Sequence, residues 1–456
     1  MEMILKQIFE ETIFWMAWII IPIIMEIIPA IGGFLILVKK KLITKTGVKP
    51  ILLPEITLII PIYNSSKTLH DCLESVYVSS YPNEKISIML VNNQSKDNSF
   101  EIFTMCQKDF PELSMQWLNA KQGKSKALNM ALFNSAGKYI IHIDSDGKLE
   151  PNALGNVVER FEQNSKIHCL TGAVLIDPSL VEETDGFLLK MMRKCEMYEY
   201  CQAFLAGRNF ESELNSIYTL SGAFSAFRKS TILKTQLYNT DTVCEDTHLT
   251  FQVRRMLKKS VNICENALFF VDPIDDFNKL YTQRQRWQRG EIEVSHMFLE
   301  QELTMTKGFF GNFMVRMLFF DHTFAFPRMI WYFALICLAF LNYPIKLILG
   351  SVIIIYCLYI FSTFLYFLNI CAYLKDFKAL KKYYCSNWYL IFLLPFFNFI
   401  VFWIRLAGII NCINAESVWK TDTLSEEWNK FKNTIKSDFL PIINTIKKLR
   451  KKVNNE

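Results

Sequence analysis

Residues 138–146 read KYIIHIDSD, a short apolar run that ends in two aspartates with a serine between them. So short a run predicts a buried β-strand, with Asp144, Ser145 and Asp146 in the turn that follows it. Two carboxylates this close can share a hard cation such as Mg²⁺ or Mn²⁺. The same sequence also occurs in ordinary solvated turns, so the neighbouring segments decide which interpretation applies.

Three more buried strands are expected upstream, at residues 56–62, 86–91 and 115–118. Helices are expected between them, at residues 66–79, 97–108 and 124–135. Strands that alternate with helices predict an α/β domain whose parallel sheet is covered on both faces. Ligands of such sheets bind beyond the carboxyl ends of the strands. The sequence has neither a Walker A loop nor GxGxxG, which argues against P-loop and dinucleotide-binding proteins.

The apolar residues, 51% of the chain, are gathered into long runs. Residues 13–38 carry one charge, Glu26, and are followed by three lysines. Further runs at 324–341, 347–374 and 388–412 are each long enough to cross a bilayer as a helix. The net charge of +6 is too small to indicate a nucleic-acid partner. The twelve cysteines show no CxxC spacing, so no zinc site is expected.

These runs predict a multi-pass membrane protein with successive parts. The parts are an N-terminal transmembrane helix with a basic flank at 1–45, a soluble α/β domain at 46–305, an interfacial amphipathic helix at 306–323, a bundle of about three spans at 324–412 and a basic tail at 413–456. Lysines after the first span and between the last two place the soluble domain in the cytoplasm. The side of the tail stays open, because three late crossings put it outside whereas its basic residues favour the inside.

Polar residues recur where the predicted strands end and where helices begin. They are Pro61, Tyr63 and Asn64 after the first strand, Asn92 and Asn93 after the second, Lys124 at a helix start, Gly222 in the segment YTLSGAF, Glu245 and Asp246 before another helix, and Gln283, Arg286 and Trp287 on one helix face. In this order the set resembles the inverting family 2 glycosyltransferases of GT-A fold. It is most similar to their membrane-embedded branch, the cellulose, hyaluronan and poly-N-acetylglucosamine synthases. The resemblance covers about residues 54–290 by motif.

The resemblance implies a UDP-sugar donor and a divalent cofactor, Mg²⁺ or Mn²⁺. The residues that match the family's donor-nucleotide site are Pro61, Tyr63, Asn64, Asn92, Asn93, Lys124 and Asp144. The metal would be held by Asp144 and Asp146. The family usually has acids where this chain has Asn92 and Asn93. An asparagine amide both accepts and donates hydrogen bonds, so uracil binding is kept while another base, or simple capping of a turn, stays open.

The resemblance also implies catalytic and acceptor residues. Asp246 matches the general base that takes the proton of the acceptor hydroxyl, and Glu245 is its supporting neighbour. A metal-bound diphosphate is already a good leaving group, so no acid is needed opposite the base. The residues matching the acceptor and diphosphate side are Gly222, Gln283, Arg286 and Trp287.

The first functional hypothesis is a plasma-membrane synthase that extends a polysaccharide for export, with the bilayer, the growing glycan and accessory membrane subunits as partners. The alternative is non-processive transfer of one sugar to a lipid-linked acceptor. It stays open because the late spans carry few polar residues to line a sugar channel. A third hypothesis, an inactive scaffold subunit, follows from the replacement of the usual acids by Asn92 and Asn93.

Overall fold

The computed structural model of the 456-residue chain describes residues 16, 18–20, 23–43, 53–299, 325–414, 423–429 and 432. The expected interfacial helix at 306–323 and most of the expected tail at 413–456 lie outside the described residues. The boundaries of the five expected parts therefore stay predictions.

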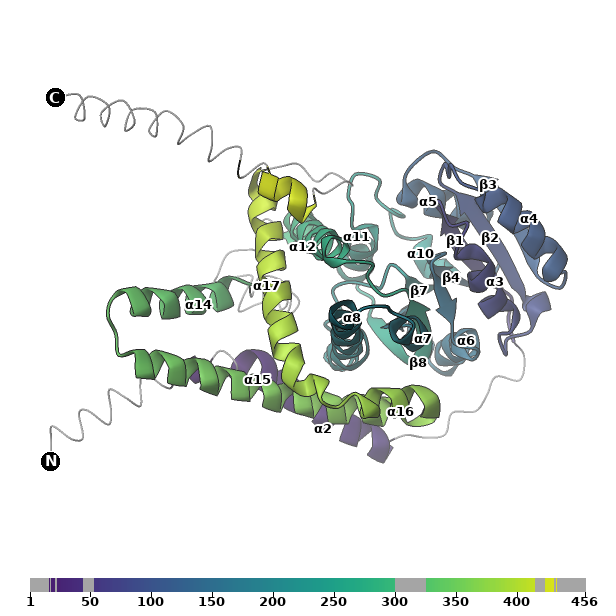
Figure 1. The fold of residues 1–456 in the computed structure, drawn as a ribbon. Helices are drawn as coiled ribbons and strands as arrows, with labels where there is room; N and C mark the ends of the chain where they lie inside the picture. The colour runs from purple at the N-terminus through teal and green to yellow at the C-terminus, as the bar shows by residue number, and fades with distance from the viewer. Residues whose placement is uncertain are drawn as a thin grey trace, which may run out of the picture.

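One sheet of eight strands forms the centre of the α/β domain, in the order β3-β2-β1-β4-β7-β6-β8-β5 (Figure 1). The strands are β1 (Ile56–Ile62), β2 (Ile86–Asn92), β3 (Ser114–Asn119), β4 (Tyr139–Ile143), β5 (Gly147–Leu149), β6 (Cys169–Ile176), β7 (Phe224–Arg228) and β8 (Val261–Val271). The first four predicted strands match β1 to β4 within two residues at each end. The expectation of a purely parallel sheet is wrong, because β7 runs antiparallel to both β4 and β6, and β5 runs antiparallel to β8, whereas β6 and β8 pair in parallel.

Strand β1 is buried along its whole length because both faces of the sheet are covered. Leu58, Ile60 and Ile62 alternate along the strand and pack in one core with residues of α3 (Leu69–Tyr77) and α4 (Ser99–Asp109). Ile59 points to the other face and packs among residues of α5 (Lys124–Asn134). Helix α6 (Ala153–Gln163) covers the first face beside β8. The run of β1 is thus apolar almost throughout because its successive side chains pack into the cores on both faces of the sheet.

The second half of the α/β domain is mainly helical. Its helices are α7 (Pro178–Glu182), α8 (Phe187–Tyr200), η3 (Cys201–Gly207), α9 (Arg208–Glu213), α10 (Lys229–Ile232), α11 (Glu245–Phe251), η4 (Gln252–Met256) and α12 (Phe277–Leu299). Elements α8, η3 and α9 form one continuous rod whose middle, η3, is a π-helix. A π-helical turn widens the backbone locally and is found frequently at functional sites.

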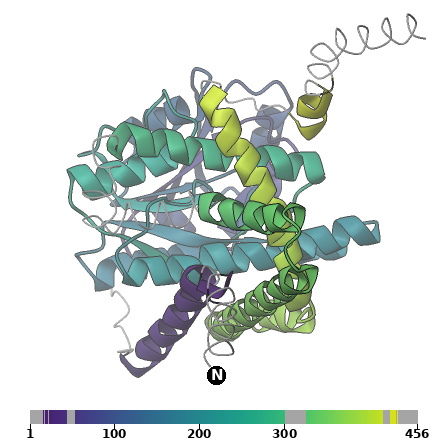
Figure 2. The ribbon, with the colours of Figure 1, turned by 90° about the vertical axis from the view of Figure 1, so that its left-hand side faces the viewer.

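The apolar helices lie together on one side of the α/β domain, at the left of Figure 1, and Figure 2 shows them from that side. They are η1 (Ile23–Ile27), α2 (Ile28–Ile43), α14 (Ala325–Phe340), α15 (Ile345–Tyr373) and α17 (Leu390–Asn414), with the short α16 (Lys378–Ser386) before α17. Within the described residues, the helical stretches Ile345–Asp376 and Leu390–Asn411 are long and apolar enough to cross a bilayer. Helix α17 packs along α12, and α2 packs along α15, where Asn369 Nδ2 donates to the Ala30 carbonyl at 3.3 Å.

Gly137, in the turn before β4, tests how tightly this core is packed. A Cβ added there would lie 2.5 Å from the Thr57 backbone nitrogen, which cannot move without disturbing β1. We expect Gly137→Ala to lower the free energy of unfolding by about 1–3 kcal/mol, the usual cost of overpacking. Thermal unfolding of the detergent-solubilised protein measures the effect.

Gly155→Ala is the matched control, because its Cβ would meet only Ser80 Oγ at 3.9 Å. Gly155 lies in α6, where alanine is favoured over glycine by up to about 1 kcal/mol, so the control should be neutral or stabilising. Equal melting temperatures for the two variants would show that the loop before β4 is not packed as described.

Candidate active site

A cavity of about 1210 Å³ opens at the carboxyl end of β4 and continues between the apolar helices. Most of the residues predicted from the sequence line it: Lys124, Asp144, Asp146, Gly222, Glu245, Asp246, Gln283, Arg286 and Trp287. The other predicted residues, Pro61, Tyr63, Asn64, Asn92 and Asn93, are not among its lining residues. They lie at the neighbouring carboxyl ends of β1 and β2.

The ammonium of Lys124 lies between the carboxylates of Asp144, in the turn after β4, and Glu245, at the start of α11. Its Nζ lies 2.6 Å from Asp144 Oδ1 and 3.8 Å from Glu245 Oε1. Burial alone would lower the pKa of Lys124, but the two carboxylates outweigh it and the net shift is upward. Burial likewise disfavours the charged form of Asp144, yet Lys124 beside it holds the pKa of that carboxyl well below its usual range. The Lys124 ammonium and the Asp144 carboxylate are therefore both charged at neutral pH.

The helix that carries Lys124 is fixed at its start by Gly123. This residue has φ +129°, a conformation that glycine adopts without strain. Its backbone N–H donates to Asn93 Oδ1 at 2.5 Å. The end of β2 thereby sets where α5 begins, and with it the place of the Lys124 ammonium.

Asp146 is the second carboxylate of the turn after β4. Burial and the nearby Asp144 charge raise its pKa to about 6. No lysine, arginine or histidine of the described part of the chain forms an ion pair with it. His142, buried in β4, has its Nε2 3.6 Å from Asp144 Oδ1, and burial lowers its pKa, so it adds no positive charge at neutral pH. The carboxylate oxygens of Asp144 and Asp146 are ligands that suit Mg²⁺ or Mn²⁺, completed by ligand oxygens and water.

Glu245 and Asp246 begin α11 and face the same cavity. Burial raises the pKa of Glu245 to about 7, with Lys124 opposing the shift and Asp246 adding to it. Burial also raises the pKa of Asp246, although the Thr247 N–H donates to its Oδ1 at 2.7 Å. A carboxylate with a raised pKa is a better proton acceptor near neutral pH.

Gly222 has a direct structural reason to be glycine. A Cβ there would lie 2.9 Å from Asp246 Oδ2, closer than such atoms normally approach. The missing side chain thus leaves room for the carboxylate of Asp246. The assignment of Gly222 to the acceptor side, made from the sequence, stays a prediction.

Helix α12 brings Gln283, Arg286 and Trp287 to the wall of the cavity. The indole of Trp287 packs edge-on against the ring of Phe204, with centroids 5.9 Å apart. The π-helical η3 supplies that ring. The sequence reasoning missed His142 and the buried Arg284 of α12, because neither belongs to a recognisable spacing. A charged residue inside the QRQRW segment was the one available signal for Arg284.

The asparagines at the end of β2 hold the loop together. Asn92 Oδ1 accepts from the Ser95 N–H at 2.8 Å, and its Nδ2 donates to Asn119 Oδ1 at 3.0 Å. Asn92 thus has the turn-capping role that the sequence left open, whereas Asn93 Oδ1 accepts from the Gly123 N–H at the start of α5. Beside them Asn64 has φ +53°, and Tyr63 is 47% exposed and available to a ligand.

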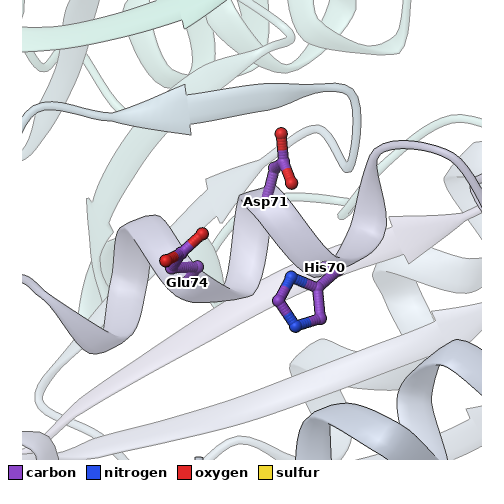
Figure 3. A group of neighbouring side chains, drawn as sticks. All are labelled: His70, Asp71 and Glu74. Carbon is purple, nitrogen blue, oxygen red and sulfur yellow. The ribbon is translucent and has the colours of Figure 1, made fainter. Parts of the chain in front are cut away.

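A second group of side chains that could bind a metal lies on α3 (Figure 3). His70, Asp71 and Glu74 bring one ligand atom each to within 4.8 Å of one another. Two of them already have partners: Asp71 pairs with Lys148 at 2.9 Å, and His70 Nε2 lies 3.3 Å from Asp109 Oδ2. This group is not among the residues that line the cavity, so it serves below as a comparison site.

The chain shows similarity to known proteins in both sequence and fold. The model of glycosyl transferase family 2 matches residues 57–233. Poly-β-1,6-N-acetyl-D-glucosamine synthase of Staphylococcus epidermidis is 26% identical over 239 residues, 52% of this chain and 55% of that protein. The enzyme of the same name in Staphylococcus aureus strain COL is 24% identical over 283 residues, 60% of this chain and 64% of that protein. The matches thus span between half and two thirds of these relatives.

Among solved structures, a mannosyltransferase from Pyrobaculum calidifontis, in complex with GDP-mannose and Mn²⁺, has a similar fold. The TM-score is 0.55 at 17% sequence identity, over 77% of this chain and 96% of that one. This likeness supports the GT-A-like, Rossmann-like architecture of the α/β domain.

The pair Asp144 and Asp146 should be the main site for a divalent cation. We expect Asp146→Asn to weaken Mn²⁺ binding in the presence of saturating UDP by at least about 10-fold, because changes in a metal's ligand shell commonly do so. Electron paramagnetic resonance of the free Mn²⁺ measures the affinity. Asp71→Asn, in the group on α3, is the control and should leave it unchanged. The reverse pattern would move the metal site to α3.

Proposed function

Because the chain is a glycosyltransferase of family 2, we propose that it extends a polysaccharide from a UDP-sugar donor, with inversion at the anomeric carbon. The observation that carries the proposal is one cavity. It holds the Lys124–Asp144 pair, the carboxylate of Asp246 and the indole of Trp287, and it continues between the apolar helices. A single site can then bind the donor, activate the acceptor and lead the product away.

The donor nucleotide would lie across the carboxyl ends of β1 and β2, with its diphosphate reaching Lys124. Tyr63 offers an exposed ring against which a base can stack. A divalent cation held by Asp144 and Asp146 would offset the diphosphate charge and help it leave. The names of the two Staphylococcus relatives make UDP-N-acetylglucosamine the first donor to test.

In the proposed transfer step Asp246 is the general base. An acceptor hydroxyl oxygen attacks the anomeric carbon of the donor and forms the new glycosidic bond. The bond from that carbon to the diphosphate oxygen breaks, and UDP leaves. The hydroxyl proton passes to the carboxylate of Asp246, whose raised pKa suits it to this role. Glu245 supports the base by holding the Lys124 ammonium, whose Nζ lies 3.8 Å from Glu245 Oε1.

The acceptor would stack on Trp287, with Gln283 and Arg286 near the diphosphate. Beyond them the cavity runs past polar and aromatic side chains of the apolar helices: Tyr332, Tyr356, Tyr359, Tyr366, Asn398 and Arg405. Aromatic rings and polar groups suit a sugar chain, which supports a synthase whose product passes between the apolar helices. Its place in the plasma membrane, with the catalytic domain in the cytoplasm, belongs to the same proposal and is supported by the lysines that flank the apolar runs. Accessory subunits for export belong to the same proposal.

A second candidate is the transfer of one sugar to a lipid-linked acceptor. The specific observation in its favour is that the far part of the cavity is also lined by apolar side chains, among them Val352, Ile353 and Phe396. These suit an acyl or prenyl chain as well as they suit the membrane. Asn92 and Asn93 replace acids of the family, but the carboxylate of Asp246 is kept. No observation therefore favours the third hypothesis, an inactive scaffold.

A panel of radiolabelled nucleotide sugars tests both candidates. Purified membranes are supplied with UDP-N-acetylglucosamine, UDP-glucose, UDP-galactose or GDP-mannose, and the products are sized by gel and extracted with organic solvent. Labelled polymer supports the synthase, and short, solvent-soluble label supports the lipid-linked acceptor. Label incorporated from GDP-mannose alone would overturn the UDP-sugar assignment.

Asp246→Asn should lower the transfer rate by about 100-fold or more, because an amide cannot take the proton of the acceptor hydroxyl. The same variant should keep Mn²⁺-dependent UDP binding, since it leaves Asp144, Asp146 and Lys124 unchanged. Radiolabel transfer and UDP titration calorimetry measure the two properties. Transfer at the wild-type rate would show that another group is the base.

The transfer rate should fall as the pH is lowered from neutral. Burial raises the pKa of the base, Asp246, so its carboxylate is protonated at a higher pH than that of an exposed aspartate. Burial also raises the pKa of the neighbouring Glu245 to about 7, so the charge beside the base changes near neutral pH. Glu245→Gln should move this acid limb to lower pH, because it removes a negative charge from the neighbour of Asp246. Initial rates at saturating donor between about pH 5 and 9 provide the profile. An acid limb unchanged in Glu245→Gln would contradict the coupling of the two carboxylates.

A further inference from the structure

We propose that Arg284, inside the wall of the cavity, is a positioning residue for sugar transfer that sets the orientation of Gln283 and Trp287. The inference rests on the proposed function, because it assigns Trp287 to the acceptor and Gln283 to the diphosphate. Arg284 itself needs no contact with either substrate. It acts through the two neighbours on α12 that line the cavity with it.

Arg284 ties α12 to α8 through a buried ion pair. Its side chain is 0% exposed, and Nη2 lies 2.6 Å from Glu199 Oε2. A second carboxylate, that of Glu196, lies 3.8 Å from the same nitrogen. Burial raises the pKa of Glu196 to about 7, against the effect of Arg284. The guanidinium, which stays protonated in proteins, is thus held at a fixed place between the two helices.

The guanidinium covers the indole of Trp287. Arg284 Cζ lies 4.5 Å from the centroid of that ring, within the range of a cation–π contact. It also lies 5.4 Å from the ring of Tyr200, which belongs to α8. Together with the edge-on contact of Phe204, these groups leave the indole little freedom to turn. A sugar that stacks on Trp287 would therefore meet a platform already in place, and fixing a reacting group before the reaction lowers the barrier.

The same guanidinium determines which end of the Gln283 amide is free. Arg284 Nη1 donates to Gln283 Oε1 at 2.6 Å. An amide whose oxygen accepts from arginine presents its NH₂ group elsewhere, and NH₂ is the group that can donate to a phosphate oxygen. Without Arg284 the amide could rotate and turn its oxygen toward the negatively charged diphosphate. Arg284 thus makes Gln283 a donor on the substrate side.

A role in stability alone does not explain a fully buried arginine here. Burying an ion pair costs several kcal/mol per ion before its own attraction is counted, and well-packed apolar residues often stabilise a protein equally well. The arginine is specific in another way, because one planar group contacts Glu199, Gln283 and Trp287 at the same time. A lysine has no planar surface to stack on an indole and cannot hold all three.

A mutant cycle tests the proposal on the full-length, detergent-solubilised enzyme with the donor that the panel identifies. We expect Arg284→Lys to lower kcat about 10- to 100-fold, the effect of a displacement of about 1 Å in an active site. We expect adding Arg284→Lys to the variant Gln283→Ala/Trp287→Phe to change its kcat by less than about 3-fold, since Arg284 acts through those two side chains and coupled residues are not additive. An effect of Arg284→Lys in that background as large as in the wild-type enzyme would overturn the proposal.

The matched control is Arg228→Lys. Arg228 is also an arginine over aromatic rings, 5.5 Å from Tyr139 and 5.2 Å from Phe161, but it is not among the residues that line the cavity. Its substitution should lower the melting temperature and leave kcat within about 2-fold, because it removes the same kind of contact away from the substrates.

Fluorescence provides a readout that needs no turnover. The emission spectrum of Trp287 is obtained by subtracting the spectrum of Trp287→Phe from that of the wild-type protein. The same subtraction is made between Arg284→Lys and the double variant Arg284→Lys/Trp287→Phe. A shifted difference spectrum in Arg284→Lys supports the proposal, and an unchanged one overturns it. If Arg284→Lys does not fold, Glu199→Gln, which keeps the guanidinium but weakens its anchor, should produce a smaller shift in its place. Wild-type kcat in Trp287→Phe would overturn the acceptor assignment of the proposed function, and the fluorescence would still decide the role of Arg284.

Discussion

The candidate active site depends on the balance of charge around Lys124. One buried ammonium faces the carboxylates of Asp144, Glu245 and Asp246, with Asp146 close by. The carboxylate in direct contact, Asp144, has a lowered pKa, and the pKa values of the other three are raised. The site is therefore short of positive charge without a ligand. A divalent cation would supply it, and one of the less neutralised carboxylates is free to act as a base.

This arrangement assembles residues that are far apart in the chain. Lys124 is placed by the glycine that starts α5, and Asp144 by the end of β4. Asp246 is placed at the start of α11, where Gly222 leaves room for its carboxylate. The antiparallel β7 pairs with β4 directly after Gly222, and thus carries that glycine to the carboxyl end of the parallel strands. A mixed sheet, and not the purely parallel one expected, brings the segment of Gly222 to the turn that carries Asp144, where the Asp144 N–H donates to the Ala223 carbonyl at 3.2 Å.

Most of the residues that the sequence pattern singled out line one cavity, and the exceptions lie at the ends of β1 and β2. Strand β1 has the bounds that its apolar run predicted, and Lys124, Asp144, Asp146, Asp246 and Trp287 share one cavity. Other features of the site depend on packing between distant segments. The role of Gly222 depends on an atom 2.9 Å away, in a residue that begins a different helix, which no local pattern encodes. Arg284 was missed because burial and an ion pair with a distant helix, not spacing, distinguish it.

The sequence by itself determined the first four of the eight strands, the long apolar runs and the residue types that could carry the chemistry. These follow from periodicity and composition, which are local properties of the chain. Only the tertiary structure decided the direction of β7, the pairing of Lys124 with two carboxylates and the contact of Arg284 with Trp287. Each of these depends on how distant segments pack, and burial makes such contacts strong by removing water from around the charges.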